Sequence, residues 1–344
     1  MSKSRLYSFL IFLKRIQKKL FEDFLNFLLS LVLLIILIVF IFNSLNWIIF
    51  KFNWSVVTSN IELFAYGSFP SNEGWRPIIW MIYIFLLFCL TIFEHEQKWI
   101  RKNLSIGWIS TLPLGIFLLY GGIGLSPVMT RNWGGLTLTI FLTSCSLILS
   151  LPLGIALALC RQSSLLLIKK LSTIYIDIMR GIPLISVLFF GQLLIPLFLP
   201  VGLEVDRVWR AIFAFTLFLS AYIAEDIRGG LQSIPSTQIE AANSLGLNEY
   251  QIMWFILVPQ SIQIALPALT NQAIGLFQNT SLMSILGLVE LLGVGRSVLA
   301  NPDFIGQYIE VYIWLATVYW LVCTIMAIIS KNLEKRILLR KSSF

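Results

Sequence analysis

Long apolar runs alternate with short polar segments along most of the chain. An α-helix needs about 20 mainly apolar residues to cross the hydrocarbon core of a bilayer, and runs of about 18 or more with few charges are typical of such spans. Eight runs reach this length, at residues 24–42, 77–94, 104–123, 134–160, 178–200, 208–226, 263–287 and 309–330. The pattern therefore predicts an all-α polytopic membrane protein with about eight transmembrane helices.

The composition excludes an ordinary soluble domain. Hydrophobic residues make up 58% of the chain and charged residues 12%, whereas soluble domains carry about 25% charged residues. The net charge of +8 does not indicate a nucleic-acid partner, because the basic residues cluster beside the apolar runs, where they set topology and contact lipid headgroups. No small-residue cleavage site follows the run at 24–42, so we interpret that run as a retained first helix.

The basic residues also predict the orientation. With the N-terminus inside, segments 1–23, 95–103, 161–177, 227–262 and 331–344 are cytoplasmic, and with their helix edges they hold nineteen of the 25 Lys and Arg residues. The six on the other side are Lys51, Arg76, Arg131, Arg207, Arg210 and Arg296. Because cytoplasmic loops are enriched in Lys and Arg, both termini are predicted to be cytoplasmic.

Few residues outside the apolar runs suggest separate chemistry. Segment 43–76 is predicted to be an external loop whose aromatic residues form an interfacial belt, with partner docking as the alternative; these residues are Trp47, Trp54, Tyr66 and Trp75. The four cysteines, Cys89, Cys145, Cys160 and Cys323, lack C-x-x-C spacing and are expected to be buried, unreactive thiols. The single histidine, His95, cannot build a metal cluster, and no metal site or catalytic residue is expected.

Residues 236–260 form a polar segment with its own folding signals. Thr237 and Glu240 have the spacing of a capping box, which predicts a helix over 237–245 that ends at Gly246. Asn248 repeats the pattern with Gln251 and is expected to begin a second helix that runs to Pro259. These residues could be no more than helix caps and stops. The small pair Ala241 and Ala242 beside Glu240 instead favours a rigid knob that inserts into a groove on another protein.

The same segment resembles the cytoplasmic "EAA" loop of ABC-importer permeases, E-A-A-x3-G-x9-I-x-L-P. The matching residues are Glu240, Ala241, Ala242, Gly246, Ile256 and Pro259, while Val258 replaces the leucine. Further segments appear in order: W-G-G-L-T-L-T-I (133–140), L-P-L-G-I-A-L-A-L (151–159), M-R-G-I-P-L-I (179–185), A-Y-I-A-E-D-I-R-G-G-L-Q-S-I-P (221–235), Q-N-T-S-L (278–282) and N-L-E-K-R (332–336). Together they resemble the polar amino-acid branch of these permeases over about residues 132–337.

The resemblance implies an architecture and a set of partners. Residues 126–337 would form a five-helix type I ABC-importer permease core with the coupling loop at 228–262, residues 1–125 an extension with three spans, and 338–344 a cytoplasmic tail. The implied partners are a second permease subunit, the same or related, two ATP-binding subunits and a periplasmic or tethered solute-binding protein. The implied location is the bacterial cytoplasmic membrane. This chain has no G-x-x-x-x-G-K-[ST], so Mg-ATP would bind the partner ATPase and no cofactor is expected here.

Polar side chains inside the apolar runs are candidates for the substrate path. Such groups are costly in hydrocarbon unless they face a partner or water, although Ser and Thr can bond to their own helix. The candidates are Thr139, Thr143, Gln192, Ser220, Tyr222, Asn271, Gln272, Gln278, Asn279, Thr280 and Ser281. We assign Gln278, Asn279, Thr280, Ser281, Gln192 and Tyr222 to the path. Related permeases often have K-D-T-S-L where this chain has Q-N-T-S-L, so the resemblance favours neutral or acidic over cationic amino acids.

Charged residues at helix ends have two interpretations. Asp177 and Arg180 are expected to form a structural pair or to contact headgroups. Glu225, Asp226 and Arg228 suggest an interfacial ion cluster, with a gate or a brace for the coupling loop as the alternative.

The sequence thus predicts a permease subunit of an ATP-driven amino-acid importer, not itself an enzyme, that works by alternating access. An ion-coupled secondary transporter is the main alternative. It would need intramembrane acids, for which Glu290, expected near the outer face, is the one mid-to-late candidate. A membrane enzyme acting on lipid or isoprenoid substrates would need clustered Asp and His residues or a metal motif, and the sequence has neither.

Overall fold

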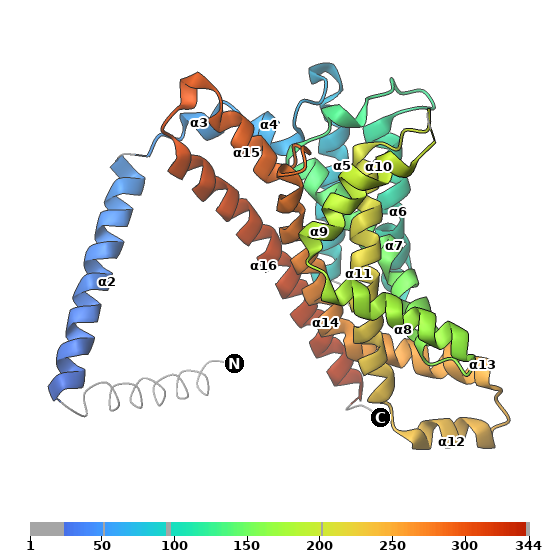
Figure 1. The fold of residues 1–344 in the computed structure, drawn as a ribbon. Coiled ribbons are helices and arrows are strands. Elements are labelled where there is room, and N and C mark those ends of the chain that lie inside the picture. Colours follow the sequence, from blue (N-terminus) through green and yellow to red (C-terminus); the bar gives the residue numbers. More distant parts are fainter. Residues whose placement is uncertain (1–23, 51, 94–97, 201, 342–344) are drawn as a thin grey trace. The chain divides into compact units, whose positions relative to one another are not determined.

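The computed structural model describes residues 24–50, 52–93, 98–200 and 202–341, and nearly all of them are helical (Figure 1). The chain divides after Ser55 into two compact units. The predicted all-α membrane fold is confirmed: within these residues, seven helices are long and apolar enough to span a membrane, and a bent helix pair, taken as one span, raises this number to eight. His95 lies outside the described residues.

With one exception, at residues 166–181, the longer helices follow the predicted apolar runs. They are α2 (Phe24–Phe50), α5 (Trp75–Phe93), α6 (Lys98–Tyr120), α7 (Gly135–Arg161), α8 (Leu166–Gly181), α11 (Arg207–Gln232), α14 (Val258–Asn279) and α16 (Tyr308–Lys341). Shorter elements join them: α3 (Ser55–Thr58), α4 (Ile61–Tyr66), α9 (Leu184–Phe189), α10 (Ile195–Phe198), α12 (Ser236–Ser244), α13 (Glu249–Gln251) and α15 (Leu291–Leu299), with 3-10 or π turns between several of them.

Helix α2 belongs to the first unit and is apolar on every side. Its 27 residues are longer than the predicted run at 24–42, because the apolar sequence resumes after Asn43 and Ser44. A helix that is hydrophobic all round is suited to lipid on every face. Helix α2 is therefore a membrane span by length and composition.

Helix α11 is the centre of the second unit. It packs most extensively on α7 and α14, and next on α8 (Figure 1). Two close approaches need glycine. A Cβ added to Gly154 of α7 would lie 2.5 Å from the Ile223 side chain, and one added to Gly230 of α11 would lie 2.5 Å from the Ser261 carbonyl oxygen of α14. These crossings bring the backbones of the three helices close together, as is usual for small residues at membrane helix interfaces.

The crossing at Gly230 gives a test of this packing. Gly230→Ala is expected to destabilise the protein by about 1–3 kcal/mol, because the new methyl group meets backbone that cannot move away. Gly229→Ala is the matched control: its Cβ would have nothing within 4 Å, and alanine should stabilise the helix by up to about 1 kcal/mol. Thermal unfolding in detergent measures both. Shifts of the same sign would contradict the packing described here.

The predicted span at 178–200 is wrong at its start. The chain is helical from Leu166 to Gly181, in what was predicted as a loop, and then bends by 106° before the segment Leu184–Phe198. The cause is local: Pro183 cannot supply the amide that would continue α8, and Ile182 before it adopts the extended backbone that a following proline favours. Helix α8 thus lies across the end of the bundle (Figure 1).

The predicted external loop at 43–76 is largely folded. Helix α2 takes up its first part, and α3 and α4 follow. Val56, Val57 and Phe64 are buried against α15 and α16, in a second apolar cluster. Tyr66 is buried in the main core and not at an interface, whereas Trp54 and Trp75 are exposed as a belt would require. The division near residue 125 remains a prediction.

The four cysteines are free thiols. Cys145 is buried, and Cys89, Cys160 and Cys323 are half-buried. Full burial is thus confirmed for Cys145 alone, and the inert role of the four thiols remains a prediction.

Candidate functional site

Helix α12 begins one residue earlier than predicted. It runs over Ser236–Ser244 with Pro235 at the N-cap, and no side chain caps it. The predicted capping box of Thr237 and Glu240 is therefore wrong. Pro235, with φ −61°, places the helix start immediately after itself, so Thr237 is already inside the first turn. The Glu240 side chain is left exposed.

The turn after α12 and the start of the next helix are confirmed. Gly246 has a φ of +78°, which glycine adopts at little cost. The Leu247 N–H donates to the Ala242 carbonyl at 3.2 Å and the Gly246 N–H to the Asn243 carbonyl at 2.9 Å, which together form a Schellman motif. Asn248 and Gln251 form the predicted capping box, with bonds of 2.8 and 3.0 Å. The segment is a stiff helix–turn–helix.

The two alanines of the motif have different surroundings. Ala242 is buried against the core, whereas Ala241 and Glu240 are exposed, so the predicted small-residue tip consists of Ala241 alone. Leu245 beside the turn is 81% exposed. The Gln260 amide of α14 donates to Gln238 Oε1 of α12 at 2.7 Å, which ties the segment to the bundle.

The second helix does not end at Pro259. It continues from α13 through the π-helical turns Ile252–Leu257 into α14, where Pro259 occupies the first turn. Proline lacks an N–H and its ring clashes with the carbonyl four residues earlier. The wider π turns before it accommodate the ring, so the chain remains helical. Ile256 lies half-buried against the core and links this stretch to the bundle.

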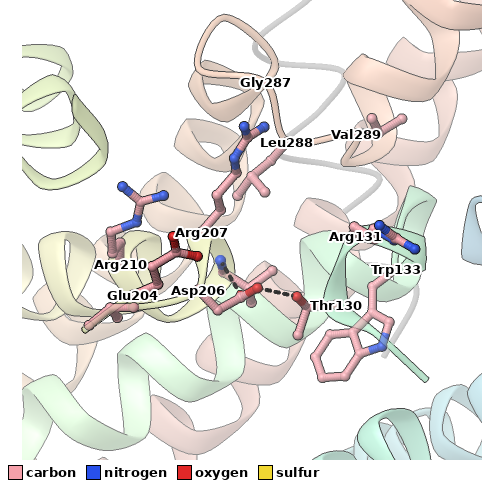
Figure 2. Close-up of a pocket in the computed structure, with 12 residues that line it drawn as sticks. Thr130, Arg131, Trp133, Glu204, Asp206, Arg207, Arg210, Gly287, Leu288 and Val289 are labelled. Carbon is pink, nitrogen blue, oxygen red and sulfur yellow. Dashed lines mark hydrogen bonds between the residues drawn. The ribbon is translucent and has the colours of Figure 1, made fainter. Parts of the chain in front are cut away.

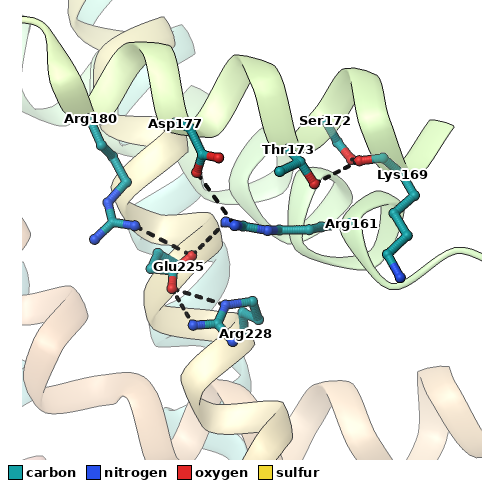
Figure 3. Close-up of polar contacts among 8 residues, drawn as sticks. All are labelled: Arg161, Lys169, Ser172, Thr173, Asp177, Arg180, Glu225 and Arg228. Atoms are coloured by element: carbon teal, nitrogen blue, oxygen red, sulfur yellow. Dashed lines mark hydrogen bonds and ion pairs between the residues drawn. The ribbon is translucent and has the colours of Figure 1, made fainter. Parts of the chain in front are cut away.

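A five-residue ion cluster joins the helix ends near α12 (Figure 3). Its centre is the carboxylate of Glu225 in α11, which Arg161 of α7 contacts at 2.8 Å and Arg180 of α8 at 3.5 Å. Arg228, one turn along α11, donates from Nε to Glu225 Oε1 at 2.9 Å. Asp177 pairs with Arg161 at 3.4 Å, so the predicted Asp177–Arg180 pair is wrong. One carboxylate thus connects α7, α8 and α11.

Asp226, the neighbour of Glu225, faces a different helix. The Gln272 amide of α14 donates to Asp226 Oδ2 at 3.1 Å. Adjacent acids of α11 therefore connect it to the α7–α8 side and to α14, within two turns of the end of α11.

The predicted path residues fall into two groups. On α14, Asn271, Gln278 and Asn279 are exposed although they lie in a membrane span. Thr280 is buried and its hydroxyl donates to the Phe277 carbonyl at 2.7 Å, while Ser281 bonds to the Gln278 carbonyl at 2.7 Å. Gln278 donates one amide N–H to Cys323 Sγ of α16 at 3.6 Å. The remaining polar groups of the exposed amides need water or a protein partner, because lipid offers them no hydrogen bonds.

Gln192 and Tyr222 lie apart from these amides. The Gln192 side chain is buried and donates to the Arg207 carbonyl at 2.8 Å, at the opposite end of α11 from α12. Tyr222 lies under Arg180, with the guanidinium carbon 5.9 Å from the ring centroid. The structure therefore places the path candidates at separate levels of the bundle.

Other polar candidates bond to their own helix, and Thr139 also bonds to the start of α15. The hydroxyls of Thr139 and Thr143 donate to carbonyls one turn earlier in α7, and Thr139 also accepts the Leu291 N–H at 3.1 Å. Ser220 donates to the Leu217 carbonyl at 2.8 Å.

Glu290 is a buried helix cap. Its carboxylate accepts the N–H groups of Leu292 and Gly293 at 2.8 and 3.0 Å and the Tyr319 hydroxyl at 3.2 Å. Burial raises the pKa of Glu290 to about 7, although its hydrogen bonds act in the other direction. Three donors thus hold this acid in place at the start of α15.

Sequence reasoning missed the role of Arg161. The Glu225–Arg228 contact has an i,i+3 spacing that can be read from the sequence, but Arg161 is 64 positions away from Glu225. Only its position directly after an apolar run, as the first residue of a cytoplasmic segment, hinted at a neighbour of opposite charge.

The chain is similar to known transport proteins over most of its length. Residues 150–339 match the family described as binding-protein-dependent transport system inner membrane component. The inner membrane amino-acid ABC transporter permease protein YhdY of Escherichia coli K12 is 35% identical, over 93% of this chain and 92% of its own. The glutamate/glutamine/aspartate/asparagine transport system permease protein BztC of Rhodobacter capsulatus is 40% identical over 62% of this chain, which spans half of that relative.

A solved structure shares the architecture. A chain in the crystal structure of an amino acid ABC transporter with histidines is 29% identical, with a TM-score of 0.53, and the match covers 59% of this chain and 92% of that one.

Proposed function

The chain belongs to the binding-protein-dependent transport system inner membrane components and is an ABC-importer permease of the amino-acid branch, and from this premise we propose that it imports neutral or acidic amino acids by alternating access driven by partner ATPases. Such permeases are transport components and not enzymes. They are multi-pass proteins of the inner membrane that work with an ATPase and a solute-binding protein.

One observation carries the coupling proposal: α12 presents Glu240, Ala241 and Leu245 outward while it is fixed to the bundle from behind. Buried Ala242 and the Gln238–Gln260 bond prevent it from moving independently. Its chain neighbours are α11 and, through α13, α14. A force applied to α12 by a docked ATPase would therefore reach both helices.

The exposed amides of α14 support the transport path. Asn271 and Gln278 are seven residues apart and lie on one face of the helix, close to Asn279. A second permease subunit, identical or related, would cover this face and enclose a watered path between the two chains. With one ATPase for each permease, the assembly has two ATP-binding subunits. The charge asymmetry of the sequence supports a cytoplasmic location for the two termini and α12.

The substrate class follows from Asn279 and the relatives. YhdY is named as an amino-acid permease, and BztC as one for glutamate, glutamine, aspartate and asparagine. An uncharged amide at position 279 gives a cationic side chain no counter-charge on the path. Neutral and acidic amino acids are therefore favoured here.

Asn279→Asp is expected to shift selectivity toward lysine and arginine by about tenfold relative to glutamine, since a carboxylate would pair with the cationic side chain. Competition of unlabelled amino acids against labelled uptake measures the shift. Asn301→Asp is the control, because Asn301 caps a 3-10 turn outside the spans and aspartate is an equally good cap. An unchanged profile in Asn279→Asp would remove Asn279 from the path.

The proposal is tested by uptake of a ¹⁴C-labelled mixture of the protein amino acids into proteoliposomes. The vesicles hold this chain with its companion permease, its ATPase and the solute-binding protein. Uptake should require ATP on the ATPase side and should persist when proton and sodium gradients are collapsed. Uptake that followed an ion gradient without ATP would support the secondary transporter instead. The capping role of Glu290 speaks against that alternative, because its carboxylate is already held by three donors.

A further inference from the structure

A polar cavity of about 680 Å³ opens at the end of α11 opposite α12 (Figure 2). Three segments line it: residues 130–133 before α7, residues 204–210 at the start of α11, and residues 287–289 before α15. These segments are far apart in sequence, so the fold alone brings them together. A cavity of this volume has room for an amino acid and several waters.

Charges of both signs converge on this cavity. Arg131, Arg207 and Arg210 supply guanidinium groups, and Glu204 and Asp206 supply carboxylates. Figure 2 shows Arg207 and Arg210 on one side and Arg131 with Trp133 on the other. The cavity therefore has a net charge of about +1, with separate basic and acidic groups.

Most of the basic groups have no protein acceptor. In the described part of the chain, neither the Arg131 nor the Arg207 guanidinium makes a hydrogen bond or an ion pair. Arg210 donates one N–H to the Gln192 carbonyl at 2.6 Å, and its Nε is buried without an acceptor. Arginine donors in a cavity need an anion or water, and their planar geometry matches a carboxylate.

The two acids differ in what they already bind. Asp206 caps α11 by accepting the Val208 N–H at 2.8 Å, and it also accepts the Thr130 hydroxyl. The Glu204 side chain is exposed and forms no hydrogen bond or ion pair with the described residues. Asp206 thus holds the cavity wall together, and Glu204 is available to a ligand.

We propose that this cavity is a reception site for the amino acid. It binds the α-carboxylate of the amino acid at Arg207 and Arg210, and the α-ammonium group at Glu204. This rests on the proposed function, and it adds a site that every amino acid can use, because the two groups recognised are common to them all. With α12 in the cytoplasm, the cavity faces outside and receives the solute before it reaches Asn279. Acidic side chains of a docked binding protein are the competing occupant, but exposed Arg207 and half-buried Arg210 with the acid Glu204 beside them fit a zwitterion better than a purely acidic surface.

The test measures binding of the ¹⁴C-labelled amino-acid mixture to the purified complex of permeases and ATPases without the binding protein. Arg207→Ala should weaken binding about tenfold, as expected for loss of a charge-assisted bond, and Glu204→Gln should weaken it in the same direction. The Arg207→Ala protein should still fold, because the Arg207 side chain makes no hydrogen bond or ion pair within the described part of the chain. Arg296→Ala, at an exposed arginine of α15 away from the cavity, should bind as the wild type does.

Competing ligands separate the possible occupants. Amino-acid amides, which keep the ammonium but lack the carboxylate, should displace the label poorly. Three outcomes would each overturn the proposal. Arg207→Ala could bind the label as well as the wild type, the wild-type complex could fail to bind it, or amino-acid amides could displace it as well as the unmodified amino acids do. If Arg207→Ala weakens only the docking of the binding protein, the arginines are docking contacts and the proposal is wrong. Failure of ATP-driven uptake with this binding pattern intact would instead count against the proposed function.

Discussion

Glu240→Lys is expected to reduce ATP-driven amino-acid uptake by at least about tenfold while the chain remains folded. Glu240 is exposed at the middle of α12, so reversal of its charge removes no internal contact. A reversed charge at a docking surface costs about 2 kcal/mol or more, which corresponds to about thirtyfold in affinity for the partner. Uptake into proteoliposomes and the amount of ATPase that co-purifies with the permease measure the effect.

Glu249→Lys is the matched control for this variant. Glu249 is an exposed acid of the same segment, in α13 on the other side of the Gly246 turn. Its reversal should cost less than about 1 kcal/mol, through the helix dipole alone, and should leave uptake near the wild-type level. Normal uptake by a fully expressed Glu240→Lys, or an equal loss in the two variants, would contradict the role given to α12.

Glu225→Gln is expected to lower the free energy of unfolding by about 1–3 kcal/mol and to slow uptake. The change leaves Arg161, Arg180 and Arg228 around a neutral amide, so three like charges lose the group that holds them together. Helices α7, α8 and α11 then separate more easily just before α12 begins. Thermal unfolding in detergent and uptake by the same preparation measure the two effects.

Asp177→Asn tests whether the position at the centre of the cluster matters. The Asp177 side chain is 57% exposed, and its one ion pair among the described residues is with Arg161, at 3.4 Å. Exposed pairs contribute about 0–1 kcal/mol, so this variant should resemble the wild type. If Glu225→Gln were as stable and active as Asp177→Asn, the cluster would be no more than a solvated surface feature.

The spans could be predicted from the sequence because apolar length is a local property of the chain. Among the described residues, seven long helices arise where the runs were found, although several of their ends lie before or past the predicted ones. The prediction of a straight span at 178–200 failed because hydropathy does not register a sharp bend, although Gly181 and Pro183 lie where the chain bends. The burial of Val56 and Phe64 against α15 and α16 depends on packing between distant segments, which hydropathy does not contain.

In the candidate sites, too, contacts between residues close in sequence could be predicted and contacts between distant residues could not. The Gly246 turn and the Asn248–Gln251 box involve residues at most five positions apart, and both were predicted. The start of α12 was misplaced because Pro235 and Thr237 were competing signals, and the proline prevailed. The contact of Arg161 with Glu225 and the cavity around Arg207 join residues dozens of positions apart, so only the fold reveals them.

The central claim is that α12 is where a separate ATPase acts on the membrane bundle, and site-specific photo-crosslinking tests it most directly. A benzophenone amino acid at exposed Ala241 should crosslink to the ATPase subunit in the assembled complex, and the yield should change when ATP binds. The same group at Ile123, which is 93% exposed between α6 and α7, should not reach the ATPase. No ATPase crosslink from position 241, or labelling of that position from outside the cell, would contradict the account.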